Sequence, residues 1–266
     1  MSAEIELYFM DMKADNFTLE KYFSRIGYGG NAKRDIATLR EIMRCQLFSV
    51  PFENLDVQAG KIVSLVPEEI VEKILMRRRG GYCYEVNGLF AMALRELGVA
   101  YTFVAARPML YAARRLKTHM ALVGEVDGEE WLFDLGFGSY GIRGPMRVAE
   151  LEVAVLQDFD TYMLSKNIEN HYRLQTLVDG QWTDQYEFDR SPQEWIDFVP
   201  ANYFNSTHPD SIFVKKLFVV LHNPAGRVTL LGDTLKTVVN GVTTKEIVSM
   251  ENRAALLAST FGLYMF

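Results

Sequence analysis

The strongest constraint on the fold is a change in hydrophobic period close to residue 101. Before it, apolar residues recur at helical spacing in segments 17–27 and 34–48, where Leu39, Ile42 and Met43 would line one face. Another helix is predicted to begin at Pro67, because proline is favoured in the first helical turn, and to end near Gly80. The first hundred residues therefore predict a helical region.

After residue 101 the pattern changes to that of strands. Asp127-Gly128 and Asp179-Gly180 each lie between alternating segments, which is typical of tight β-hairpins. Asn223–Gly226, Gly232-Asp233 and Asn240-Gly241 separate further strands, and a final amphipathic helix is predicted at about 245–257. The chain is thus predicted to be α+β, with a helical part, an antiparallel β part and a small mixed part.

The charge and cysteine content exclude several classes of protein. A net charge of −6 over 266 residues argues against nucleic acid as the main partner. Two cysteines provide neither a disulfide framework nor metal-ligand spacing. The first residues, Met-Ser-Ala-Glu-Ile-Glu, lack the pattern of a secretory signal, and no run of 18 apolar residues occurs. We therefore expect a cytoplasmic protein that binds neither membranes nor a metal.

Cys83 is predicted to lie at the start of a helix. It follows Gly80 and Gly81 in the stretch RRRGGYCYEVNGLF, and the helix would end before Gly98. A thiol at a helix N-terminus with arginines nearby should ionise more easily than a free cysteine, as a nucleophile requires. The alternative is that Cys83 is a small buried apolar residue, as most free cysteines are.

The first Asp-Gly hairpin brings a histidine and an aspartate together. With Asp127-Gly128 as the two-residue loop, His119 lies opposite Gly136 and on the same face as Asp134, one diagonal step away. Such a pair is explained by a structural hydrogen bond, by half of a metal site, or by the base and orienting group of a catalytic triad. The metal interpretation is weak because the other histidines are distant in sequence. A cysteine at a helix start favours Cys-His-Asp nucleophilic catalysis.

Four motifs over the first 140 residues carry a family resemblance. PFENLD at 51–56, RGGYC at 79–83 with Asn87 after it, Thr118-His119, and FDLGFG at 133–138 resemble the arylamine N-acetyltransferases in order and spacing. The resemblance implies that Cys83 accepts the acyl group, that His119 is its base, and that Asp134 orients the imidazole.

The resemblance also implies an architecture. It would consist of an N-terminal helical bundle at 1–98, a central antiparallel β-barrel at 99–205 and a C-terminal α/β lid at 206–266, around a core like that of cysteine proteases. Arg79, Glu53 and Asn87 would mainly support the site.

Acetyl-CoA is the co-substrate that the resemblance implies. Residues 136–141 fit GxGxxG, but they follow a hairpin strand and open no obvious helix, so a dinucleotide site is not indicated. In the family this loop lies near the coenzyme A pyrophosphate. The residues implied at the coenzyme are Gly136, Phe137, Gly138, Ser139 and Thr118, and those at the aromatic amine or hydrazine are Phe137 and Tyr84. Acetyl transfer would be of the ping-pong type, through an acetyl-cysteine on Cys83.

One departure from the family pattern precedes the PFEN motif. The family often has a histidine five or six residues before the proline, whereas this chain has Gln46 and Cys45, the latter expected to be a buried thiol.

Two competing interpretations of Cys83, His119 and Asp134 remain. A transglutaminase- or papain-like hydrolase would work without coenzyme A, and a non-catalytic module would bind an aromatic ligand with Cys83 packed away.

Overall fold

The computed structural model describes residues 12–111, 113–138 and 140–264. Its helices are α2 (Leu19–Ile26), α3 (Ile36–Ser49), α4 (Leu55–Gln58), α5 (Pro67–Val71), the π-helical η1 (Glu72–Met76), α6 (Cys83–Glu96), the 3₁₀-helical η2 (Trp195–Phe198), α7 (Val199–Thr207), α8 (Ile212–Lys215) and α9 (Met250–Phe261). The predicted helices at 17–27, 34–48 and from Pro67 are confirmed within a few residues.

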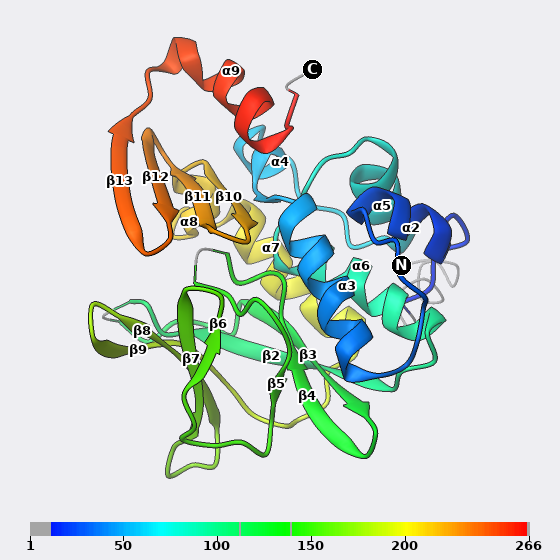
Figure 1. Cartoon of the computed structure of the whole chain (residues 1–266). Coiled ribbons are helices and arrows are strands. Elements are labelled where there is room, and N and C mark those ends of the chain that lie inside the picture. Colours follow the sequence, from blue (N-terminus) through cyan, green and yellow to red (C-terminus); the bar gives the residue numbers. More distant parts are fainter. Residues whose placement is uncertain (1–11, 112, 139, 265–266) are drawn as a thin grey trace.

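The strands form two antiparallel sheets. The larger, eight-stranded sheet has the order β5 (Met146–Arg147), β4 (Glu129–Phe133), β3 (His119–Val126), β2 (Tyr101–Pro108), β9 (Gln181–Phe188), β8 (Tyr172–Val178), β7 (Asp160–Lys166), β6 (Val155–Gln157). It is a curled sheet with β5 and β6 at its two ends (Figure 1). The predicted antiparallel β region is therefore confirmed in this coarser form.

The smaller sheet pairs one early strand with four strands from the last part of the chain. Its order is β1 (Phe52–Glu53), β10 (Phe218–Asn223), β11 (Gly226–Leu231), β12 (Thr234–Val239), β13 (Val242–Ile247). The short strand β1 comes from the predicted helical segment, and the predicted boundary at residue 205 falls inside α7. Figure 1 shows this sheet above the curled one, with α9 at its upper side, where Leu257 and Phe261 pack against Val219 and Leu230.

The predicted start of the final helix is wrong by about five residues. Lys245 pairs with Lys236 in the β12–β13 ladder, and α9 begins only at Met250. The β-branched sequence after the Asn240-Gly241 turn extends the hairpin, and the hydroxyl of Ser249 then caps the helix by accepting from Asn252 N–H. The chain therefore changes from strand to helix at this capping residue.

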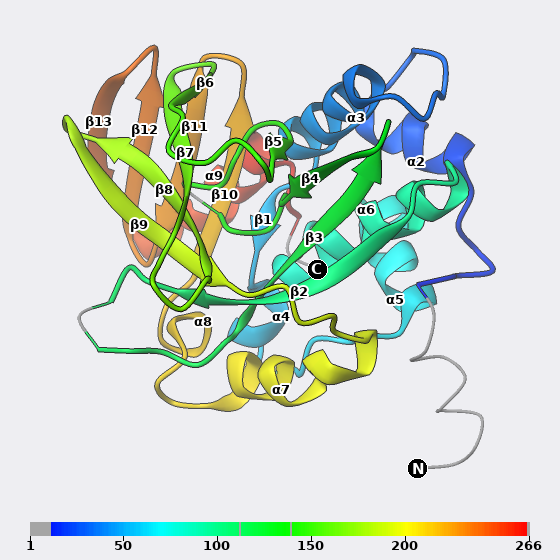
Figure 2. The ribbon, with the colours of Figure 1, turned by 90° about the horizontal axis from the view of Figure 1, so that it is seen from below.

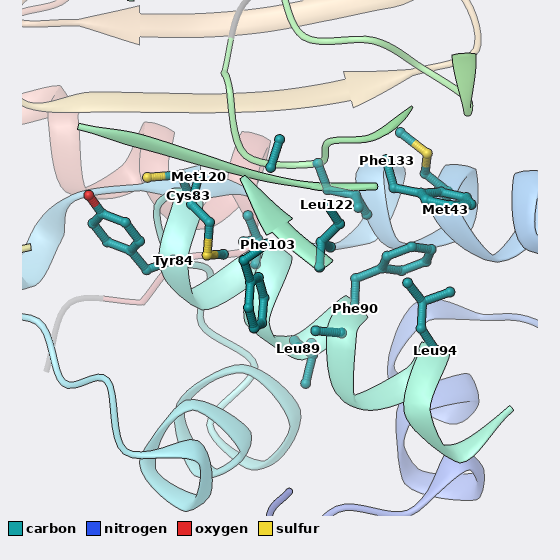
Figure 3. Close-up of a cluster of buried hydrophobic side chains, with 14 of the residues drawn as sticks. Met43, Cys83, Tyr84, Leu89, Phe90, Leu94, Phe103, Met120, Leu122 and Phe133 are labelled. Carbon is teal, nitrogen blue, oxygen red and sulfur yellow. The ribbon is translucent and has the colours of Figure 1, made fainter. Parts of the chain in front are cut away.

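The main core lies between α6 and the hairpin strands. Figure 3 shows Leu89 and Phe90 of α6 beside Leu122 and Phe133 of β3 and β4, and the rings of Phe90 and Phe133 have centroids 5.5 Å apart. Twelve of the fourteen residues of α6 are buried, so the helix is enclosed on nearly all sides. Cys83 lies at the first position of this rigid, buried helix.

The helices η2 and α7 pack against the segment 63–65. Figure 2 shows α7 at the lower edge of the view, below β2. Trp195, at the start of η2, is buried and donates its indole N–H to the Leu65 carbonyl, and Asn202 of α7 donates to the Val63 carbonyl, both at 2.8 Å. Within the described residues, no helix has the length and apolar character needed to cross a membrane.

Candidate active site

Two glycines position the start of α6 against β1. A Cβ on Gly80 would lie 1.9 Å from the Pro51 carbonyl oxygen, so only glycine allows the two backbones to approach this closely. Gly81 accepts from Glu53 N–H at 2.9 Å. The RGG sequence therefore holds Cys83 at a fixed point beside the PFEN motif.

The predicted hairpin register is confirmed from the turn as far as the pair Leu122–Phe133. Leu122 pairs with Phe133, Gly124 with Trp131 and Val126 with Glu129. Asp127 and Gly128 have φ angles of 54° and 76°, as a two-residue hairpin turn with both central residues left-handed requires. The strand β4 ends at Phe133, and Asp134 follows at its end.

His119 and Asp134 are in direct contact. His119 Nε2 lies 2.8 Å from Asp134 Oδ2, and both side chains are buried. The other carboxylate oxygen, Oδ1, accepts from Asn87 Nδ2 at 3.1 Å and from Gly136 N–H at 2.9 Å. Burial alone would raise the pKa of Asp134, but His119 and these donors together hold it below its usual range. Asp134 is thus an ionised, fixed acceptor for the imidazole.

Asn87 connects the helix of Cys83 to the pair. Its Nδ2 also donates to the Met120 carbonyl at 2.7 Å, and its Oδ1 accepts from Leu135 N–H at 2.8 Å. One α6 side chain therefore bonds the backbone of both hairpin segments and the carboxylate of Asp134. This arrangement fixes Cys83, four residues earlier, relative to His119.

The environment of the Cys83 thiol contradicts one expectation. Burial raises the pKa of Cys83, and the charge of Asp134 raises it further, against the hydrogen bonds from Met120 and Tyr84 N–H that lower it. The helix N-terminus alone therefore does not make this thiol acidic. A thiolate here needs a positively charged partner, and the protonated imidazole of His119 is the group suited to that role.

A cavity of about 490 Å³ opens onto Cys83 and His119. Thr118, Gly136 and Phe137 also line it. Its remaining walls are mainly apolar and include the aromatic side chains of Phe52, Tyr111, Phe204, Phe213 and Phe218, with a charged side from Arg107, Arg114, Arg115 and Asp210. The cavity can therefore hold an aromatic molecule against the thiol and an anionic group beside the arginines.

Other residues predicted at the cavity have different positions. Tyr84 is fully buried, and its hydroxyl donates to the Thr118 carbonyl at 2.9 Å. Gly138 is buried, and its carbonyl accepts from His222 Nε2 at 3.0 Å. Ser139 lies outside the described residues. Tyr84 and Gly138 thus do not line the cavity themselves.

Several neighbours of the site were not identified from the sequence. The ring of Tyr186, on β9, lies 5.0 Å from that of His119 and 4.9 Å from that of Phe137. Asn205, on α7, donates to the Thr118 carbonyl at 2.9 Å. Both come from segments far along the chain, and no local pattern marks them. The curled sheet and α7 bring them to the hairpin.

The departure at residues 45 and 46 has a local explanation. Gln46 is buried, accepts from the Tyr22 hydroxyl at 2.6 Å and donates to the Val86 carbonyl at 2.8 Å. The amide thus joins α2 and α3 to α6 by hydrogen bonds. Cys45 is only half-buried, so the expectation of a buried thiol is wrong.

Among the described residues, no group of three or more His, Cys, Asp or Glu side chains could hold a metal ion.

Replacing Gly136 by alanine is expected to disturb the site through a direct clash. A Cβ there would lie 2.5 Å from Cys83 Cα and 3.0 Å from Asn87 Nδ2. We expect the free energy of unfolding to fall by about 1–3 kcal/mol, as in other overpacked cores, measured by urea denaturation. The control Gly29→Ala adds a Cβ with nothing within 4 Å and should leave stability nearly unchanged. Equal stability of the two variants would contradict the close approach of Gly136 and Cys83.

Comparisons with known proteins agree with the geometry. The sequence model of the N-acetyltransferase family matches residues 35–265. The arylamine N-acetyltransferase of Escherichia coli is 33% identical over 92% of this chain and 88% of its own length, and human arylamine N-acetyltransferase 1 is 31% identical over 82% of each.

Solved structures are similar over nearly the whole chain. The Mycobacterium tuberculosis arylamine N-acetyltransferase superposes with a TM-score of 0.88 at 32% identity, covering 92% of this chain and 93% of the other. The Mycobacterium marinum enzyme in complex with CoA gives 0.86 at 31% identity, with 92% coverage of both. The match of sequence extends over residues 35–265 and that of fold over 92% of the chain, and the chain belongs to the arylamine N-acetyltransferase family.

Proposed function

We propose that this protein transfers an acetyl group from acetyl-CoA to an aromatic amine or hydrazine through an acetyl-cysteine on Cys83. The observation that carries the proposal is that Cys83 and His119 line one cavity, while Asp134 holds the imidazole from the buried side. The names of the relatives and the coenzyme A complex of the M. marinum enzyme support it.

In the first half-reaction Cys83 becomes acetylated. Asp134 engages Nε2 of His119, so Nδ1 is the ring nitrogen left to accept the thiol proton. The thiolate attacks the thioester carbonyl, the bond to the coenzyme A sulfur breaks, and that sulfur takes the proton from the imidazolium. Backbone N–H groups at the start of α6, where Cys83 is the first residue, are donors suited to the oxyanion.

In the second half-reaction the amine nitrogen attacks the acetyl-cysteine. His119 takes a proton from this nitrogen as it gains positive charge, and Cys83 leaves as a thiolate. An aromatic amine is neutral at pH 7 and arrives as a nucleophile. The aromatic side chains of the cavity suit such a substrate, with Phe137 beside the imidazole at 5.1 Å between ring centroids.

The basic side of the cavity suits the phosphates of coenzyme A. Arg107 and Arg114 both contact Glu187, at 3.2 and 3.0 Å, so two guanidinium groups share this carboxylate. Arg115 lies 4.3 Å from the Tyr111 ring centroid. We assign the pantetheine end to the part of the cavity near Thr118, Gly136 and Phe137.

The proposal is tested by incubating the protein with acetyl-CoA without amine and measuring its intact mass. We expect an acetyl adduct that is absent from Cys83→Ala and that disappears when an arylamine is added. The matched control Cys45→Ala should keep the adduct. An unmodified mass under conditions where coenzyme A binds, or acetate release without an adduct as from a hydrolase, would contradict the proposal.

A further inference from the structure

A buried carboxylate lies two residues after Cys83. The side chain of Glu85 is about 3% exposed, accepts from Tyr82 N–H at 3.0 Å and contacts Lys73 Nζ at 2.6 Å. Tyr82 is the residue before α6, so this carboxylate caps the helix that begins with Cys83. One side chain thus accepts from the N–H of Tyr82, the residue before Cys83, and places a negative charge close to the thiol.

The other charged groups around Glu85 come from four neighbouring segments. Lys73, on η1, also lies 2.6 Å from Asp56 of α4 and 3.9 Å from Glu53 of β1. Arg79, in the loop before α6, contacts Glu53 at 2.8 Å. Three carboxylates therefore share two cations, so the cluster has one negative charge in excess when all five groups are ionised.

This cluster opens onto a cavity different from that of Cys83. The second cavity has a volume of about 470 Å³ and is lined by Glu85, Lys73, Asp56 and Arg79, but not by Cys83. The substrate cavity is lined by Cys83 and by none of these four residues. Glu85 can therefore exchange protons with solvent without involving the substrate cavity.

We propose that Glu85 is a positioning residue that caps the Cys83 helix and, when ionised, opposes formation of the Cys83 thiolate. The proposal rests on the function proposed above in taking Cys83 as the nucleophile. The cap holds the first turn of α6 in place. The negative charge partly cancels the positive end of the helix dipole, from which a thiolate at this position gains stability.

The direction of the electrostatic effect follows from the two groups. Burial raises the pKa of Glu85 to about 7, against the lowering effect of Lys73, while Glu53 raises it further. The charge of Glu85 in turn raises the pKa of Cys83. As pH rises through neutrality, Glu85 ionises and makes the thiol harder to ionise. The reactivity of Cys83 should consequently rise less steeply with pH than that of a thiol with no such neighbour.

The test is the pH profile of Cys83 alkylation in Glu85→Gln. The glutamine keeps an oxygen that can accept from Tyr82 N–H, and Lys73 keeps Asp56 as a partner. The rate of iodoacetamide labelling is measured at the Cys83 peptide by mass spectrometry. It should match that of the wild type below neutrality, where Glu85 is protonated, and exceed it above neutrality, with the midpoint of the profile shifted to lower pH by about one unit, the order expected for one neighbouring charge in a protein. Labelling requires no acetyl-CoA, so failure of this test and failure of the acetyl-adduct test are distinguishable.

Two further variants separate charge from capping. Glu72→Gln removes an exposed carboxylate that pairs with Arg77 and should leave the profile unchanged. Glu85→Ala removes charge and cap together, and should lower the labelling rate at every pH relative to Glu85→Gln because the first turn of α6 loses its cap. An unshifted profile in Glu85→Gln, or a shift to higher pH, would overturn the proposal.

Discussion

Replacing Asp134 by asparagine is expected to reduce acetyl transfer by about 10³- to 10⁴-fold with little change in fold. Asp134 Oδ1 accepts from Asn87 Nδ2 and from Gly136 N–H, so these two donors would select the amide oxygen of asparagine for that position. The amide nitrogen would then face His119 Nε2 as a donor. His119 would have to carry its proton on Nδ1, the nitrogen that must accept the proton of Cys83.

The measurement is the rate of coenzyme A release in single turnover, compared with Asp127→Asn. Asp127 lies in the turn of the same hairpin with φ of 54°, a conformation that asparagine adopts readily, so this control should keep full activity. Equal rates for the two variants would show that acetyl transfer needs neither the charge of Asp134 nor its control of the His119 tautomer. Circular dichroism of both variants checks that the hairpin is retained.

Local sequence patterns predicted the helices and the hairpin because each rests on neighbouring residues. Asp127-Gly128 defines a turn geometry, and the alternation of side chains then determines which residues share the face of His119. The same logic failed at the final helix. The amphipathic pattern predicted a helix start at Lys245, but this residue still pairs within strand β13. Pairing of β1 with β10 joins residues 52 and 220, a contact that no local pattern indicates.

The candidate site was predictable only where its residues lie in local motifs. Cys83, His119 and Asp134 were found by helix-start and hairpin logic, but the link between them came from a family resemblance. The expected acidity of Cys83 was wrong because sequence spacing does not report burial, which here outweighs the helix terminus. Tyr186 and Asn205 reach the site only through the curling of the sheet and the position of α7.

Replacing Asp160 by alanine is expected to lower the free energy of unfolding by about 3–5 kcal/mol, because it leaves buried guanidinium groups without their main partner. Asp160 Oδ2 accepts from Arg143 Nε at 3.0 Å and from Arg227 Nη1 at 2.7 Å. Arg143 is fully buried and donates to the carbonyls of Asn223 and Gly226, at the turn between β10 and β11, both at 3.0 Å. The carboxylate therefore connects the curled sheet to the smaller one.

The pH dependence of this loss has a defined sign. Burial alone would raise the pKa of Asp160, but Arg227 and Arg143 hold it below its usual range. The stabilisation is therefore present above the ordinary aspartate pKa and is lost as pH falls through the lowered value, so wild type and Asp160→Ala should converge in acid. Urea denaturation at neutral and acidic pH measures this, with Asp210→Ala, which removes an exposed partner of Lys215, as a control expected to show little change. A small loss at neutral pH would mean that Asp158, 3.4 Å from Arg143, compensates for the missing carboxylate, and that the two sheets are held together mainly by apolar contacts.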